Sequence, residues 1–157
     1  MLVKLYDLPD ISPQQLQLAE HGIVIKRALA LDKARIIDFV NQHFKEICAE
    51  WVFECELSLL RHPVACYIAV QNQQIIGFVS YDTSAKGFLG PLGVDANFRQ
   101  QGIARALIIQ ALHAMEYEGY GYAIIPWVSS VDYYAKAVGA IEIPNSEPGI
   151  YQRLVNQ

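Results

Sequence analysis

A strand-like run that is broken by glycine and proline, and is soon followed by a long amphipathic helix, most constrains the fold of this sequence. The run is FLGPLGV at residues 88–94. Proline cannot donate to a strand ladder and glycine weakens one, so we expect this strand to bulge or to part from its neighbour. Beyond a polar loop, apolar residues recur every three or four positions from Ile103 to Met115, which predicts a helix of about 15 residues.

The other elements are predicted from apolar spacing and from turn-forming residues. Residues 66–70 and 75–81 are strand-like runs joined by a polar tetrad, which predicts an antiparallel hairpin. Further strands are expected at 23–28, 120–126, 141–143 and 150–155. Further helices are expected from a cap at Asp32 to about Ile47, over about 50–61, and over 129–138 with Ser129 as cap. This order predicts a mixed α/β (α+β) fold with helices on both faces of one mostly antiparallel sheet.

The length of 157 residues, with 53% hydrophobic and 18% charged residues, fits one globular domain. We expect residues 1–22 to form an N-terminal arm that lies on a single domain of residues 23–157. The net charge of −4 and the lack of a basic run argue against a nucleic-acid partner. The N-terminus does not resemble a signal peptide, and no stretch reaches the roughly 20 apolar residues that span a bilayer. No membrane partner is therefore expected.

The cysteines and histidines predict no metal cofactor. Cys48, Cys55 and Cys66 are odd in number and have no paired spacing, which argues against a disulfide framework and against a zinc site. We therefore expect a cytoplasmic protein. The four histidines make no pair at helical spacing that could bind a metal ion.

The loop that leads into the predicted helix at Ile103 has the properties of an anion site. The first turn of a helix has backbone N–H groups without intrahelical partners, and the helix dipole places partial positive charge there. Gly102 and Ala104 keep this turn free of bulky side chains, while Arg99 and Arg105 add positive charge. The loop can therefore hold a phosphate or pyrophosphate.

This stretch resembles the acetyl-CoA motif of the GNAT superfamily of N-acetyltransferases. The motif is Arg or Gln, two residues, Gly, one residue, then Gly or Ala, which here is Arg99-x-x-Gly102-x-Ala104. Downstream, residues 133–140 (YYAKAVGA) are similar to the superfamily's aromatic-Tyr-x-Lys-x-Gly-aromatic signature. One residue is added before the glycine, and Ala140 replaces the final aromatic residue. The resemblance extends from about Ile23 to Val155.

The resemblance implies a GNAT-like three-layer fold in which acetyl-CoA lies where the fourth and fifth strands splay apart. Backbone groups of Leu92 and Val94 would pair with the pantetheine arm, and the Val94 N–H would stabilise the developing oxyanion. The loop amides and Arg99 would hold the pyrophosphate. The cofactor-binding residues expected on this basis are Leu92, Val94, Arg99, Gln100, Gln101, Gly102, Ile103, Ala104 and Arg105.

The resemblance also places a general acid at Tyr134, which would protonate the departing CoA thiolate. Tyr133 is the alternative if the helix register is shifted. The general base stays open among Glu54, Glu56, Asp82, Asp95 and water. Trp51 and Trp127 could line an acceptor pocket. Trp127 also stands where many superfamily members carry an asparagine that contacts the cofactor.

We therefore expect an acetyl-CoA-dependent N-acetyltransferase in which the primary amine of a small molecule attacks the thioester directly. Two alternatives remain. The first is an acyl-CoA-binding or sensory module with little or no turnover, because the aromatic residue after Gly139 is missing. The second is an acetyltransferase that acts on an amine of a protein. A homodimer is possible, because dimers are common in proteins of this superfamily.

Overall fold

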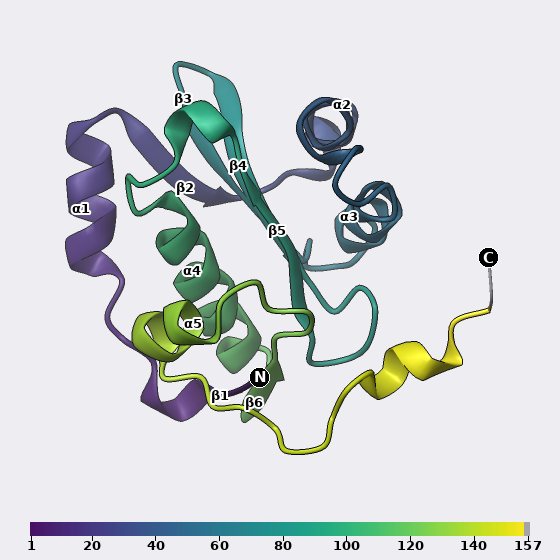
Figure 1. Cartoon of the computed structure of the whole chain (residues 1–157). Coiled ribbons are helices and arrows are strands. Elements are labelled where there is room, and N and C mark those ends of the chain that lie inside the picture. The colour runs from purple at the N-terminus through teal and green to yellow at the C-terminus, as the bar shows by residue number, and fades with distance from the viewer. Residues whose placement is uncertain (156–157) are drawn as a thin grey trace.

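The computed structural model describes residues 1–155, in which helices cover both faces of a sheet (Figure 1). The sheet is antiparallel, with its strands in the order β2 (Ile23–Arg27), β3 (Cys66–Gln71), β4 (Gln74–Tyr81) and β5 (Leu89–Val94). The predicted hairpin is confirmed as β3 and β4. Its turn residues, Asn72 and Gln73, adopt φ angles of 49° and 64°, and positive φ at both central residues is typical of a two-residue hairpin loop.

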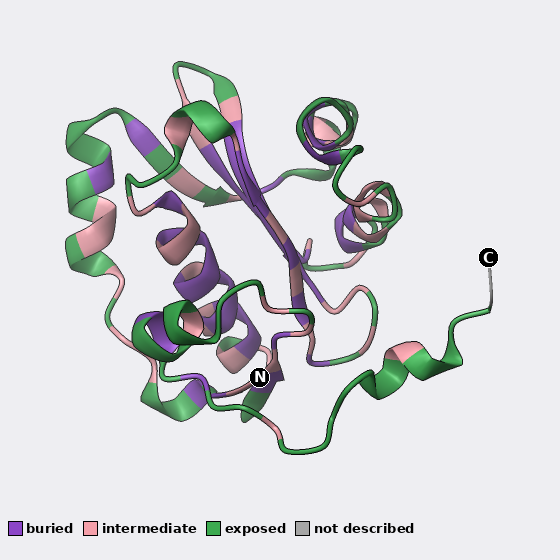
Figure 2. Cartoon of the chain, in the orientation of Figure 1, coloured by how far each residue is buried: buried purple, intermediate pink, exposed green. Residues whose placement is uncertain are grey.

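Helices α2 (Lys33–Phe44) and α3 (Trp51–Leu59) lie on one face of this sheet. On the other face lie α4 (Ile103–Tyr117), α5 (Val131–Val138) and α1 (Ser12–Glu20). Figure 2 shows that α4 is buried along most of its length. It is the central helix of the larger apolar core, whereas α2 and α3 enclose a second apolar cluster against the sheet. Within residues 1–155, no helix has the length and apolar character needed to cross a membrane.

Two predicted helix ends differ in the structure. The helix that follows Asp32 ends at Phe44, so Ile47 lies outside it and is 64% exposed instead of completing the apolar face. Asp32 stands at the N-cap, but its side chain makes no capping hydrogen bond and instead lies 3.6 Å from Arg35. Helix α5 is capped by Ser130, whose Oγ accepts from the Tyr133 N–H at 3.3 Å, and not by Ser129.

Residues 1–22 contribute regular structure to the fold. Strand β1 (Leu2–Lys4) pairs antiparallel with β6 (Tyr122–Ile124), and the short 3-10 turn η1 (Leu5–Asp7) follows it. Val3 and Leu5 are completely buried in the larger core. The sequence prediction assigned neither β1 nor α1, because a three-residue strand and a weakly amphipathic helix have little periodic signal.

The strands predicted at 141–143 and 150–155 are wrong. Ile141 makes only an isolated bridge with Leu2, through two backbone hydrogen bonds of 2.7 and 2.9 Å. Residues Gly149–Arg153 form a 3-10 turn, η4, on an exposed C-terminal segment that extends away from the sheet (Figure 1). Pro144 and Pro148 cannot donate to a ladder, and β1 already occupies the edge of β6. Strand β6 is also shorter than the predicted 120–126.

Candidate functional site

Strands β5 and β6 part from each other immediately after one point of contact. The only bridge between them within residues 1–155 joins Phe88 to Ile124, in parallel orientation. On its other side, β5 stays paired with β4, with a register shift opposite the segment between Leu89 and Leu92. The broken strand therefore both bulges and parts from its neighbour, as predicted. Strands β5 and β6 are the fourth and fifth strands of the sequence prediction, because the prediction did not include β1.

The open edge of β5 offers backbone groups of Leu92 and Val94. The Asp95 N–H donates to the Ile76 carbonyl of β4 at 2.9 Å, so alternation along the antiparallel ladder turns the N–H groups of Val94 and Leu92 away from β4. The Val94 carbonyl also points away from β4, since it accepts from Arg99 Nε at 3.4 Å. An extended ligand with amide groups can pair with this edge.

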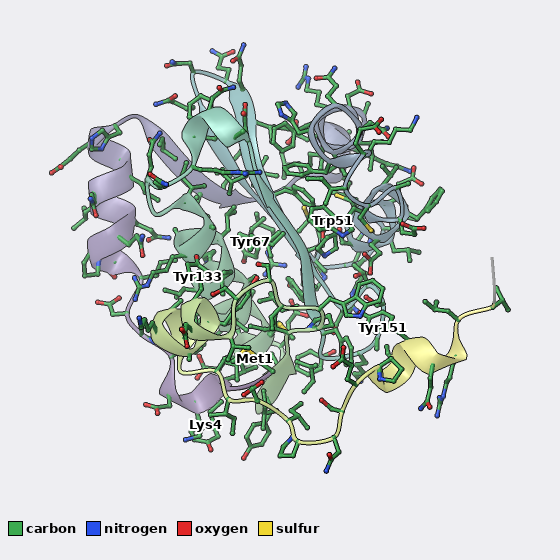
Figure 3. The ribbon with its side chains drawn as sticks, viewed as in Figure 1. Met1, Lys4, Trp51, Tyr67, Tyr133 and Tyr151 are labelled. Carbon is green, nitrogen blue, oxygen red and sulfur yellow. The ribbon has the colours of Figure 1, made fainter. Side chains whose placement is uncertain are left out.

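A cavity of about 530 Å³ lies along this edge. Its walls come from the C-terminal end of α2, the start of α3, the second half of β5, the loop before α4, the first turn of α4, and α5. The lining residues are Phe44, Ile47, Trp51, Leu92, Gly93, Val94, Phe98, Arg99, Gln100, Gly102, Ile103, Ala104, Arg105 and Tyr133. In Figure 3, Trp51 lies on the α3 side of β5 and Tyr133 on the α5 side.

A tight turn opens the first amides of α4 toward the cavity. The loop contains the 3-10 turn η3 (Ala96–Phe98), which Asp95 caps by accepting from the Asn97 N–H at 2.9 Å. Gln100 and Gly102 then adopt φ angles of 64° and 81°. Gly102 is the N-cap of α4 and provides no side-chain acceptor for the first helical N–H groups. These amides are therefore available to an anion.

Arg99 and Arg105 both line the cavity and keep their charge unpaired. Arg99 bonds to the Val94 carbonyl, and Arg105 Nη1 donates to the neutral amide oxygen of Gln14 at 2.5 Å. The ion pairs found within residues 1–155 involve other basic residues. Positive potential therefore gathers at the α4 end of the cavity, although the net charge of the chain is −4.

The structure gathers eight of the nine predicted cofactor-binding residues on the cavity wall: Leu92, Val94, Arg99, Gln100, Gly102, Ile103, Ala104 and Arg105. The ninth, Gln101, lines a separate hollow of about 140 Å³ together with Gln17, Leu18 and His21. The side chain of Gln101 is thus outside this cavity.

The two tyrosines of α5 occupy different environments. Tyr133 lines the cavity, whereas Tyr134 is not part of its wall and packs partly buried against the larger core. Burial raises the pKa of both hydroxyls, and the charge of Arg105 partly opposes the rise at Tyr133. The rings are 5.2 Å apart, edge to face. Both hydroxyls are therefore protonated at neutral pH, as a general acid must be before transfer.

Of the candidate bases, three carboxylates are engaged elsewhere. The Asp82 side chain is completely buried; Oδ2 lies 2.8 Å from Arg61 and accepts from Tyr120, and Oδ1 accepts from the Gly87 N–H at 2.6 Å. Glu56 pairs with Lys33 at 3.2 Å, and Asp95 caps η3.

Glu54 is in a different position, close to the cavity. It lies one turn beyond Trp51 on α3, where its Oε1 accepts from Ser84 Oγ at 2.5 Å. Next to Ser84, Thr83 Oγ1 donates at 3.0 Å to the carbonyl of Gly90, two residues before Leu92 on β5. Glu54 is thus held beside the Leu92 end of the cavity.

Sequence reasoning missed the apolar wall made by Phe44 and Ile47, and the contact of Gln14 with Arg105. These residues lie far from the α4 motif in the chain, so no local pattern links them to it. Of the two tryptophans, Trp51 lines the cavity, whereas Trp127 is 70% exposed and stacks on Tyr151 with ring centroids 4.2 Å apart. Figure 3 shows Tyr151 on the C-terminal segment, below α3. Among residues 1–155, no three histidine, cysteine or acidic side chains are grouped to hold a metal ion.

Residues 30–140 match the model of the Acetyltransferase (GNAT) family. This stretch contains the cavity residues of α2, α3, β5, α4 and α5. A search of curated protein sequences gives no match.

Several solved structures are similar to this chain. A GCN5-related glucosamine N-acetyltransferase region of a fungal multi-domain GH3 β-N-acetylglucosaminidase aligns with a TM-score of 0.71 and 15% identity, covering 87% of this chain and 19% of that chain. A GNAT family acetyltransferase from Brucella melitensis in complex with acetyl-CoA aligns with a TM-score of 0.59 and 20% identity, covering 74% of this chain and 81% of that chain. An aminoglycoside acetyltransferase from an uncultured soil metagenomic sample, in complex with sisomicin, aligns with a TM-score of 0.57 and 17% identity. The alignment covers 79% of this chain and 93% of that chain. At these identities the similarity is one of fold.

Proposed function

Because the chain belongs to the GNAT acetyltransferase family, we propose that it transfers the acetyl group of acetyl-CoA to the primary amine of a small molecule. The amine attacks the thioester directly while both substrates are bound. The observation that carries this proposal is the cavity that joins the open edge of β5 to the free amides of α4. A strand edge suits the amide-containing pantetheine arm, and an amide-rich turn with two unpaired arginines suits a pyrophosphate.

Each part of the cavity has a role in this proposal. Arg99, Arg105 and the first amides of α4 hold the pyrophosphate, and the edge groups of Leu92 and Val94 align the pantetheine arm. Acetyl-CoA supplies the acetyl group as an activated thioester. The Val94 N–H donates to the carbonyl oxygen as negative charge develops on it, in a cavity lined mainly by apolar side chains.

We propose that Glu54 binds the acceptor ammonium group and removes its proton. The carboxylate accepts from Ser84 in the loop before β5, and the neighbouring Thr83 bonds to the carbonyl of Gly90, two residues before Leu92 on the cavity wall. The neutral amine nitrogen then forms a bond to the thioester carbon, and the carbon–sulfur bond breaks. As the amide forms, the nitrogen loses a second proton to solvent water. A tyrosine hydroxyl of α5 donates its proton to the departing thiolate. Tyr134 is the residue that the resemblance to the family assigns to this role, and Tyr133 is the residue on the cavity wall.

The acceptor is proposed as a small amine. Two similar folds carry names that point to amino sugars, glucosamine in one and an aminoglycoside in the other. These are properties of those proteins, and they make amino sugars the first compounds to test here.

We also propose a cytoplasmic location, supported by three cysteines that are all unpaired.

Titration calorimetry with acetyl-CoA tests the proposed function. We expect one site per chain with a Kd between about 1 μM and 1 mM, the range in which the KM values of enzymes typically lie. Thiol release with a panel of amino sugars, diamines and amino acids then identifies the acceptor. No binding of acetyl-CoA at millimolar concentration would contradict the proposal.

Replacing Glu54 with glutamine is expected to lower kcat/KM for the amine about a hundredfold, because the amide cannot remove the proton of the ammonium group and general acid–base catalysis contributes about 10²–10⁴-fold. The Kd of acetyl-CoA should not change, since Glu54 is not on the cavity wall. Glu56→Gln is the matched control: Glu56 lies on the same helix and pairs with Lys33 at the surface. Equal losses of kcat/KM in the two variants would remove Glu54 from the mechanism.

One observation favours a second candidate function, that of an acyl-CoA-binding module without turnover. Within residues 1–155, no carboxylate or histidine lines the cavity. In that case acetyl-CoA binds with the expected stoichiometry, but no amine in the panel releases thiol.

A further inference from the structure

Helix α1 lies outside the stretch that matches the family model, yet it reaches the phosphate end of the cavity. It packs against β2 and α4, as Figure 1 shows. Leu18, on its inner side, is 2% exposed in the larger core. Gln14 precedes Leu18 by one turn and therefore lies on the same side of α1. This places the Gln14 side chain at the start of α4.

Both the nitrogen and the oxygen of the Gln14 side-chain amide make hydrogen bonds at the start of α4. Nε2 donates to the Gly102 carbonyl at 2.9 Å, and Oε1 accepts from Arg105 Nη1 at 2.5 Å. The same Gly102 carbonyl accepts the Ala106 N–H at 3.1 Å, which is the first hydrogen bond of α4. A methyl group at residue 102 would lie 2.4 Å from Gln14 Nε2, so the amide occupies the space beside the glycine. Gln14 thus links the N-cap of α4 to a cavity arginine.

The chemical type of this side chain matters for the charge of the cavity. An amide oxygen orients the guanidinium of Arg105 without cancelling its positive charge. A carboxylate in the same place would form an ion pair with Arg105 and compete with a phosphate for it. A methyl group would leave Arg105 free to take many rotamers, and binding would then lose the conformational entropy of this long side chain.

We propose that Gln14 is a positioning residue for cofactor binding: it holds Arg105 and the Gly102 turn in the arrangement that receives the pyrophosphate of CoA. Residues 12–20 then form part of the cofactor site and not merely of the core. This inference rests on the proposed function, since the anion concerned is that of acetyl-CoA.

The test compares three variants by calorimetric titration with acetyl-CoA at low and high ionic strength. Gln14→Ala is expected to raise Kd about tenfold, because the freed Arg105 and the Gly102 turn must then be ordered when acetyl-CoA binds. Gln14→Glu is expected to raise Kd further at low ionic strength, and the difference between the two variants should shrink at high ionic strength, where charges are screened. Gln15→Ala is the control, because Gln15 Nε2 bonds to Gln110 of the same helix α4 at 2.8 Å, away from the cavity. The Kd of Gln15→Ala for acetyl-CoA should stay within about twofold of the wild-type value, which is well below a tenfold change.

Thermal unfolding of each variant separates this role from a structural one. Gln14→Ala removes two hydrogen bonds and Gln15→Ala removes one, so both should lower Tm, whereas only Gln14→Ala should weaken the binding of acetyl-CoA. The inference is overturned if Gln14→Ala binds acetyl-CoA as tightly as Gln15→Ala, or if Gln14→Glu binds at least as tightly as Gln14→Ala at low ionic strength. Failure of the proposed function looks different, because the wild-type protein itself would then not bind acetyl-CoA.

Discussion

Replacing Gly102 with alanine is expected to raise the Kd of acetyl-CoA about a hundredfold. The residue has a φ of 81°, where an L side chain costs about 1–2 kcal/mol, so the turn that presents the α4 amides would shift. The added methyl group would also displace Gln14 from its position 2.4 Å away and release Arg105. Each effect is expected to raise Kd about tenfold, since a tenfold change in Kd corresponds to about 1.4 kcal/mol. Titration calorimetry measures the result.

Gly119→Ala is a matched control for this prediction. Gly119 lies just beyond the other end of α4, has a φ of 95°, and has no atom within 4 Å of an added Cβ. The two variants should therefore lose similar stability from backbone strain, as measured by Tm. Only Gly102→Ala should lose affinity for acetyl-CoA. If both variants keep wild-type affinity, the α4 turn is not the phosphate site.

Replacing Tyr134 with phenylalanine is expected to lower kcat about a hundredfold, which is within the usual range for loss of general acid catalysis. The Kd of acetyl-CoA should be unchanged, because the ring remains and only the hydroxyl is removed. Burial raises the pKa of Tyr134, so the hydroxyl of the wild-type protein carries its proton throughout the neutral range. Steady-state kinetics with an acceptor from the amine panel, together with calorimetry, measures both quantities.

Tyr133→Phe is the paired variant, because Tyr133 is the neighbouring tyrosine and lies on the cavity wall. It should keep most of the wild-type kcat. If Tyr133→Phe loses activity and Tyr134→Phe does not, the proton comes from Tyr133. If neither variant loses activity, no tyrosine of α5 is the general acid. An acetyl thioester of a more acidic thiol needs less protonation of its leaving group. With such a donor, the loss of kcat in the affected tyrosine variant should be smaller.

The parts of the fold that were predicted well are those with strong local patterns. The polar tetrad between two β-branched runs indicates the β3–β4 hairpin, and the apolar spacing from Ile103 to Met115 indicates α4. The last two predicted strands failed because strand formation depends on a partner that the local sequence does not show. Ile141 meets Leu2, from the opposite end of the chain, and residues 150–155 have no strand partner in the described part of the chain, residues 1–155.

The candidate site divides in the same way. Its phosphate end comes from a nearly continuous segment, Phe98 to Arg105, so a motif can reveal it. Its remaining walls come from Phe44, Trp51 and Tyr133, and Gln14 supports the site from a helix near the N-terminus. No spacing rule connects these positions.

The broken strand and the helix with a glycine at its N-cap follow from the local sequence, because proline, glycine and apolar periodicity act on the backbone within a few residues. The place where the strand opens, and the residues around it, depend on how the whole chain packs. The bridge between Phe88 and Ile124 sets the splay, and packing of α1 brings the Gln14 amide to Arg105. Such contacts join residues that are far apart in the chain, and their positions depend on how all the elements pack together.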